Sequence, residues 1–313
     1  MIKHSIAALC ALSVAAFGVA SSSLADDVAN PAANTTPSLT GSATGDDGKD
    51  VKETKEVKEQ IKESCITGDL GVTFTNEYIS RGLVQVNQGV IAQPYLDLYF
   101  KVYEGAGFIN KVTINFSLWS SIDSHVEGPG NESTVRNWEE FDWDPGIAIT
   151  FAKNFTLTTS YYEFDSPAQF FNTARSINVN LAYNDADLLH DFALNPHVTW
   201  LAELNAPGSA GLQKGGYYYE AGIAPGHTWG PVTVSLPITV GLGSRGFYNG
   251  QGFGYFAFGP QISVPISFIP ECLGKWTFSG GYTFYDLGSA AADATANGHR
   301  IQHVFQGGVG LTF

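Results

Sequence analysis

The sequence has few basic residues, few cysteines and, beyond its N-terminal segment, no long apolar run. Lys and Arg together number 16 against 30 Asp and Glu, which gives a net charge of −14 at pH 7. Nucleic acid binds to basic surfaces, so this deficit argues against a nucleic-acid partner. A membrane-spanning helix needs about 20 consecutive apolar residues. Because no such run follows the N-terminal segment, any membrane-spanning part of the chain must be a closed β-barrel.

The sequence also lacks the motifs of common catalytic and cofactor sites. It contains no phosphate-binding loop, no Cys/His cluster with zinc spacing and no G-x-S-x-G elbow. We therefore expect no cofactor and no bound metal, and we do not expect an enzyme.

Only two cysteines, Cys65 and Cys272, lie outside the N-terminal apolar segment. An exported chain enters an oxidising compartment, where two cysteines can form one disulfide. Cys65 precedes the first of twelve predicted strands, which begins near residue 67. Cys272 lies in the turn between the tenth and eleventh predicted strands, and an antiparallel barrel with a periplasmic N-terminus places this turn on the same, periplasmic side. We therefore predict a disulfide between them, with two free thiols as the alternative.

The N-terminal segment differs in composition from the rest of the chain. A short basic start, an apolar stretch and small residues before Ala25 are typical of a cleaved signal peptide over residues 1–25. Residues 26–64 form a periplasmic leader, whose first half is small and polar and is expected to be disordered. In residues 51–64, Lys and Glu alternate at helical spacing. This pattern fits either a short helix with a periplasmic partner or a solvated spacer.

Glycine and aromatic residues are abundant, with 35 Gly, 21 Phe and 14 Tyr, whereas charged residues make up only 15% of the chain. Such a composition suits a large antiparallel sheet. Beyond the leader, apolar and polar residues alternate with the period of two that gives a strand one apolar and one wet face. Twelve alternating runs lie near residues 67–74, 93–102, 112–119, 140–151, 155–164, 176–183, 192–204, 216–225, 231–242, 253–266, 276–285 and 300–313.

Single-chain bacterial outer-membrane barrels have an even number of strands, which agrees with this count. The connections between the runs are alternately shorter and longer, as expected of periplasmic turns and extracellular loops. We predict an all-β fold: a transmembrane antiparallel up-and-down β-barrel of about 12 strands over residues 65–313. A soluble β-sandwich is the alternative, but it gives less reason for aromatic residues at the strand ends.

Seven prolines fall inside the predicted strands, although proline cannot donate a ladder hydrogen bond and a closed barrel has no free edge. We expect a bulge or a local strand start at several of them. They are Pro94, Pro145, Pro196, Pro225, Pro237, Pro260 and Pro265.

The last predicted strand reads I-Q-H-V-F-Q-G-G-V-G-L-T-F over residues 301–313. It resembles the final strand of bacterial outer-membrane barrels, in which a terminal aromatic residue is the assembly signal. The resemblance implies that Phe313 serves assembly, with the barrel assembly machinery and outer-membrane lipids as partners.

A second resemblance rests on the segment Y-I-S-R-G-L-V-Q, residues 78–85, which follows the first predicted strand. Together with the alternating strands over residues 67–313, this segment resembles the opening of the TorF family of porins. The resemblance implies an outer-membrane barrel and a pore, and it implies no particular substrate.

The wet parity of each predicted strand should face the lumen, where acids outnumber bases. Because charged rings set selectivity at close quarters, such a lumen favours cations. We predict passive passage of small hydrophilic solutes with a preference for cations; the alternative is a wall that these groups only hydrate and rigidify. The residues expected in the lumen are Asp97, Glu140, Asp142, Asp144, Glu203 and Glu220, with Arg81, Lys101 and Arg300 as the bases.

Two other functions stay open. One is a non-conducting barrel that anchors or scaffolds a partner through its leader. The other is a lipid-active hydrolase, for which Ser80, Asn76 and His303 share the lipid-facing parity of the first and last strands. The carboxylates of the E-x-D-x-D sequence at 140–144 could also bind a hard cation, but a single strand gives poor convergence.

Overall fold

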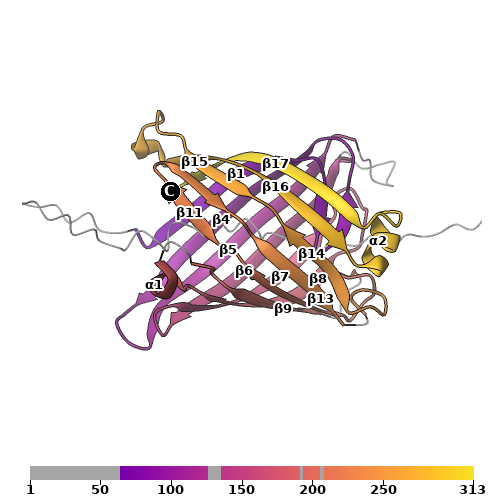
Figure 1. The fold of residues 1–313 in the computed structure, drawn as a ribbon, viewed down its shortest axis with the longest axis horizontal. Coiled ribbons are helices and arrows are strands. Elements are labelled where there is room, and N and C mark those ends of the chain that lie inside the picture. The colour runs from indigo at the N-terminus through magenta and orange to yellow at the C-terminus, as the bar shows by residue number, and fades with distance from the viewer. Residues whose placement is uncertain (1–63, 126–134, 191–192, 205–207, 245) are drawn as a thin grey trace, which may run out of the picture. The chain divides into compact units, whose positions relative to one another are not determined.

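The structure is a computed structural model, and it describes residues 64–125, 135–190, 193–204, 208–244 and 246–313 (Figure 1). The predicted signal peptide and almost all of the predicted leader, with its possible helix, lie outside these residues.

The described residues form an antiparallel barrel whose wall has twelve strands, nine of them continuous and three built from two segments each. The continuous strands are β1 (Ile66–Thr75), β4 (Ile91–Glu104), β5 (Ile109–Asp123), β6 (Trp138–Phe151), β7 (Phe155–Asp165), β8 (Ala174–Tyr183), β9 (His197–Glu203), β16 (Lys275–Leu287) and β17 (Ile301–Thr312). The segmented strands are β10 (Tyr217–Ile223) with β11 (Gly226–Trp229), β12 (Val232–Ser235) with β13 (Ile238–Gly243), and β14 (Phe253–Phe258) with β15 (Gln261–Pro265).

Pairing of β1 with β17 closes the barrel, which confirms the predicted fold class. At one end of this seam Gly68 and Phe313 exchange two backbone hydrogen bonds of 3.0 and 2.9 Å. At the other end the side-chain amide of Asn76 donates to the His303 carbonyl at 3.1 Å and accepts from the Phe305 amide at 2.6 Å. The seam is therefore fastened at both of its ends.

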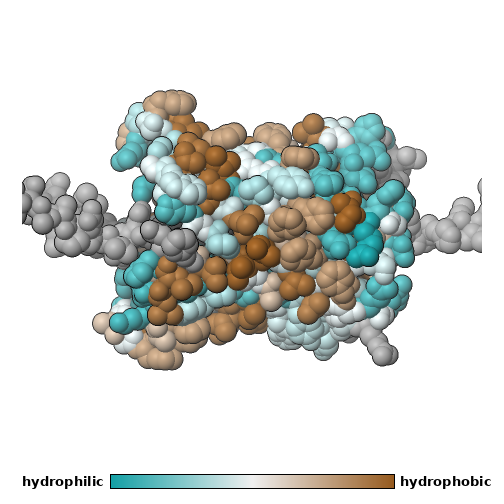
Figure 2. Space-filling view, viewed as in Figure 1, coloured by the Kyte–Doolittle hydropathy of each residue, from teal (hydrophilic) through white to brown (hydrophobic). Residues whose placement is uncertain are grey.

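The alternation of side chains follows the predicted parity. On β1, Ile66, Leu70 and Phe74 are exposed on the outside of the barrel, whereas on β6 Glu140 and Asp142 are buried inside it. On the face that Figure 2 shows, apolar side chains cover much of the middle of the barrel, and the end on the right is mostly hydrophilic. Such a surface is stable in the hydrocarbon of a bilayer and costly in water. No helix within the described residues is long and apolar enough to cross a membrane.

The prolines explain the three segmented strands. Pro225, Pro237 and Pro260 lie between the two segments of their strands, where a ladder donor is missing. Each proline carbonyl still accepts a backbone hydrogen bond of 2.8–3.2 Å from the next strand. Pro94 and Pro145 instead lie within β4 and β6, at positions that the registers with β5 and β7 skip. The missing donors thus coincide with interruptions of the ladder.

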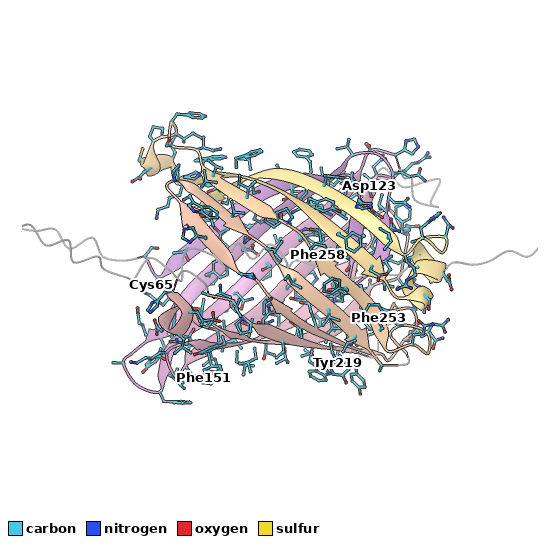
Figure 3. The ribbon with its side chains drawn as sticks, in the orientation of Figure 1. Cys65, Asp123, Phe151, Tyr219, Phe253 and Phe258 are labelled. Carbon is cyan, nitrogen blue, oxygen red and sulfur yellow. The ribbon has the colours of Figure 1, made fainter. Side chains whose placement is uncertain are left out.

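The two ends of the barrel differ. The end that carries Cys65 and Phe151, here called the turn end, has the shorter connections on average; the opposite loop end carries Asp123 and Tyr219 (Figure 3). The turn-end connections are 105–108, 152–154, 184–196 with α1 (Ala186–Leu189), 230–231, and 266–274 with the 3-10 helix η3 (Glu271–Leu273). The loop-end connections are 76–90 with β2 (Tyr78–Ser80) and β3 (Leu83–Val86), 124–137, 166–173, 204–216, 244–252, and 288–300 with α2 (Ser289–Thr295).

The predicted disulfide is not formed: Cys65 and Cys272 are both free and exposed. Cys65 precedes β1, and its carbonyl accepts from the Lys101 amide of β4 at 2.8 Å. Cys272 lies in η3, which leads into β16. Since β17 separates β1 from β16, the two cysteines are attached to strands about 10 Å apart, beyond direct disulfide reach.

The seam predicts a specific defect on substitution of Gly68. A Cβ at this position would lie 2.7 Å from the Phe313 ring and 2.7 Å from the Asp97 carbonyl. Gly68→Val should therefore displace Phe313, and it should lower the yield of folded barrel on unheated gels, as Phe313→Ala should. Gly107→Val, in a turn where a Cβ meets nothing closer than 4.0 Å, is the matched control. Equal yields for the Gly68 and Gly107 variants would show that the seam does not depend on this contact.

Candidate functional site

The first loop-end connection folds back into the barrel as a hairpin. Strands β2 and β3 pair through a two-residue turn in which Arg81 and Gly82 have φ of 47° and 74°. Positive φ at both central positions is the turn geometry that matches the twist of a tight hairpin. Ile79 and Leu83 are buried. This lumenal hairpin, residues 78–86, is a feature that the sequence analysis missed, because it predicted no strands between the runs near 67–74 and 93–102.

Contacts with the wall and the other loops hold the lumenal hairpin. The Tyr248 hydroxyl donates to the Arg81 carbonyl at 2.7 Å, and the Tyr78 hydroxyl donates to Glu140 Oε2 at 3.0 Å. The Val84 amide donates to Thr295 Oγ1 of α2 at 3.0 Å. Apolar residues from several strands and loops complete the packing, and the loop-end part of the lumen is filled by a core. The larger members of that core include Trp119, Phe164, Leu201, Tyr218, Phe247, Tyr248, Tyr255 and Leu287.

An acidic track runs along the wall formed by β1, β4, β5 and β6. Glu140, Asp142 and Asp144 follow one another on the lumenal face of β6, about 6.6 Å apart at the rise of a strand. The track continues across the wall, because the register aligns Asp144 with Ser117, Ser117 with Asp97, and Asp97 with Asp69. Like charges opposite each other destabilise a sheet. Their concentration on one wall therefore marks this face as a candidate functional site.

The structure adds three carboxylates near the loop end of this wall, Glu77, Asp123 and Glu139, all of them buried. Asp123 and Glu77 continue the lumenal parity beyond the ends of the runs predicted near 112–119 and 67–74. Extending the alternation past those ends would have identified them. Glu139 has the opposite parity and could not be found in that way. A register shift between Ser121 and Ile122 places a bulge beside it, which allows its side chain to turn inward.

The side chain of Arg81 lies between aromatic and acidic groups. Its guanidinium carbon is 5.5 Å from the centre of the Phe164 ring and 5.8 Å from that of Tyr218. It also interacts electrostatically with the three β6 carboxylates of the acidic track. The guanidinium thus lies within electrostatic range of the lumenal acids, which it approaches from the hairpin tip.

The opposite wall carries Glu220 in a polar cluster. Glu220 accepts hydrogen bonds from the hydroxyls of Tyr218 at 2.5 Å and Tyr255 at 2.8 Å, and it lies 3.4 Å from His197 Nε2. Glu203 has a different setting, because its carboxylate accepts from the amides of Ala210, Gly211 and Gly216 at 2.5–2.9 Å. Glu203 therefore organises the β9–β10 loop.

Two predicted lumenal bases bind acids near the barrel ends. Lys101 Nζ lies 2.7 Å from Glu104 Oε2, near the turn end. Arg300 Nη2 lies 2.8 Å from Asp286 Oδ1, and Arg300 Nε donates to the Leu287 carbonyl, which fastens the β16–β17 loop at the loop end.

The residues considered for lipid hydrolysis are not brought together as a catalytic site. Ser80 is fully buried in the lumenal hairpin, whereas His303 is exposed on β17 and shares a 2.8 Å hydrogen bond with the Tyr282 hydroxyl. Asn76 is engaged by the backbone of β17. A serine nucleophile requires an adjacent base, and this arrangement does not supply one from these three residues.

Glu77 predicts a pH dependence of stability. Burial raises the pKa of Glu77 from 4.5 to about 7. The folded state therefore binds this proton more tightly than the unfolded state does. The contribution of Glu77 to the free energy of unfolding is fully present below pH 4.5 and is lost as the pH rises through 7. Glu77→Gln should remove this loss, which is at most roughly 3 kcal/mol. Denaturant unfolding at pH 4.5 and pH 8 measures it, with the exposed Glu271→Gln as control. An equal pH response of wild type and Glu77→Gln would contradict the prediction.

Comparisons with known proteins assign neither a family nor an activity. No protein-family model matches the sequence, and no curated protein matches it significantly. Among solved structures, outer membrane phospholipase A from Escherichia coli is similar, with a TM-score of 0.44 and 12% identity, covering 78% of this chain and 92% of that one. The NanC porin has a TM-score of 0.42 and 12% identity, covering 77% and 98%. The KdgM porin has a TM-score of 0.38 and 8% identity, covering 78% and 99%.

Proposed function

We propose that the protein is an outer-membrane channel for the passive passage of small hydrophilic solutes, with a preference for cations. The acidic track carries this proposal: Asp69, Asp97 and the β6 carboxylates line one continuous wall of the lumen. A water-filled path beside such a wall would concentrate cations and repel anions. Arg81 interacts with the β6 carboxylates of this wall from the tip of the lumenal hairpin.

The outer surface supports residence in a bilayer. Large apolar side chains are exposed along the strands, and aromatic residues such as Trp229 and Phe268 at the turn end and Tyr217 and Tyr219 at the loop end are exposed near the two rims. Aromatic girdles flank the apolar band of outer-membrane barrels. We infer that outer-membrane lipids and the barrel assembly machinery are partners, and that the turn end faces the periplasm.

The lumenal hairpin restricts the path. It contains the Y-I-S-R-G-L-V-Q segment that resembles the TorF porins, and it packs in the loop-end core. A channel built in this way would be narrow and selective, unlike a wide diffusion pore. Movement of the hairpin would widen it.

The same packing favours a second candidate, a non-conducting barrel that serves as an anchor or scaffold. A core of buried apolar residues occupies the loop-end part of the lumen, and small barrels can be filled completely by side chains. For a hydrolase we find less support, because Ser80 and His303 lie in separate settings.

The acidic track should determine ion selectivity. In a salt gradient across a planar bilayer, the wild type should show a reversal potential of the sign for cation preference. Asp69→Asn combined with Asp97→Asn should move this potential toward zero, because the pair removes two lumenal charges without touching Arg81. Glu163→Gln, which changes an acid paired with Arg175 on the outer face, should leave it unchanged. An anion-selective wild type would refute the proposed preference.

Removing the lumenal hairpin should separate the two candidate functions. A variant in which residues 78–86 are replaced by a short Gly-Ser connection should show larger single-channel conductance steps than the wild type, because the loop-end core loses its central element. Folded yield on unheated gels serves as the control for assembly. A folded variant that remains silent would favour the scaffold over the channel.

A further inference from the structure

The groups around the Arg81 side chain come mainly from the barrel wall. Phe164 lies on β7 and Tyr218 on β10, so the two rings near the guanidinium belong to different strands. The carboxylates facing it belong to β6. Aromatic faces combined with carboxylates are the usual surroundings of a bound organic cation. The wall thus forms a site suited to a cation, and the Arg81 guanidinium of the lumenal hairpin occupies it.

The site holds more carboxyl groups than cations. Glu140 and Asp142 are 0% exposed and Asp144 is 3% exposed, so three buried carboxylates face one guanidinium. The carboxyl groups of Glu140 and Asp142 interact with each other, whereas within the described residues Asp144 Oδ1 has no hydrogen-bond partner and Arg81 Nη1 has none either. A buried carboxylate oxygen without a partner is costly. The site therefore has an acceptor that Arg81 leaves unused.

We propose that this site binds the guanidinium or primary ammonium group of a small organic cation, and that Arg81 is a tethered occupant which such a solute displaces. The inference rests on the proposed channel function and names its substrate class. Displacing the side chain loosens the hairpin tip, which the hydrogen bond from Tyr248 to the Arg81 carbonyl and the bond from the Val84 amide to Thr295 still attach to the loops. Solute binding and widening of the path are thereby coupled.

The surroundings select the class of ligand. An anion would face three carboxylates and is excluded by charge. A hard metal ion requires several converging oxygen ligands, and the described residues contain no group of three acidic, His or Cys side chains placed to hold one. A planar guanidinium or an alkylammonium can contact the rings of Phe164 and Tyr218 while it donates to the carboxylate oxygens.

Chemical rescue of Arg81→Gly tests the site. Glycine tolerates the positive φ of this turn position, and the substitution leaves the carboxylates without their cation. The midpoint of heat unfolding of the purified full-length barrel, followed by gel shift, should fall relative to wild type. Methylguanidinium chloride should restore most of the loss with saturable dependence, and sodium chloride at the same concentration should not. Wild type should show a smaller saturable shift, because the solute must displace Arg81 in order to bind.

The control is Arg175→Gly, which removes a guanidinium that lies 2.7 Å from Glu163 on the outer face of the barrel. Because Arg81 remains in place, this variant should show no larger methylguanidinium-specific shift than wild type. If Arg81→Gly does not fold, the readout becomes refolding yield: recovery of folded barrel with methylguanidinium supports the site, and no recovery overturns it. An equal shift in both variants, or no specific shift for Arg81→Gly, also overturns the inference.

This readout does not depend on conduction. Specific rescue in a protein that stays silent in the bilayer would support the organic-cation site and reject the channel. A cation-selective channel whose Arg81→Gly variant shows no specific rescue would support the proposed function and reject the site.

Discussion

The structure depends on one constraint: every backbone hydrogen-bonding group of a strand that crosses hydrocarbon must find its partner in another strand. A sheet satisfies this constraint only by closing, so the β1–β17 seam decides whether the rest of the wall can exist. Asn76 and Phe313 fasten the two ends of that seam. The same constraint explains the placement of the in-strand prolines, since their missing donors coincide with interrupted pairing. Segmented strands on one side of the barrel are a consequence.

Closure also creates an interior that water, solute or side chains must fill. Here the chain fills part of it with its own first loop-end connection, and Leu83, Phe164 and Phe247 are fully buried in the resulting core. Apolar packing at the loop end and carboxylates along the β6 wall meet at the hairpin tip. Arg81 lies at this boundary, with aromatic rings and acids around its guanidinium. Its charge allows an apolar plug to sit against an acidic wall.

Periodicity predicted the wall well and the interior poorly. A period of two fixes which side chains of a strand share a face, so the lumenal positions of Glu140, Asp142 and Asp144 followed from the sequence. The hairpin did not, because its strands have three and four residues, too short for a periodic signal. Glu139 was not predicted to be lumenal, because a bulge changes which side chains of a strand face the lumen and no residue pattern in the sequence identifies this bulge. The disulfide prediction was wrong because it relied on flexible connections to bridge a gap set by strand order.

The acidic track explains why the lumenal hairpin carries an arginine at its tip. Buried carboxylates beside one another disfavour the folded state unless protons or cations neutralise them. An arginine that was fixed and fully paired would leave the carboxylates of the acidic track no free acceptor for a solute. A wall without any cation would be costly to fold. An arginine on a short hairpin, with an unused acceptor near it, lies between these extremes. In the proposed channel it would offset part of the charge of the wall in the absence of solute and yield its place when another cation arrives, so that filling the lumen and selecting a solute would depend on the same interaction.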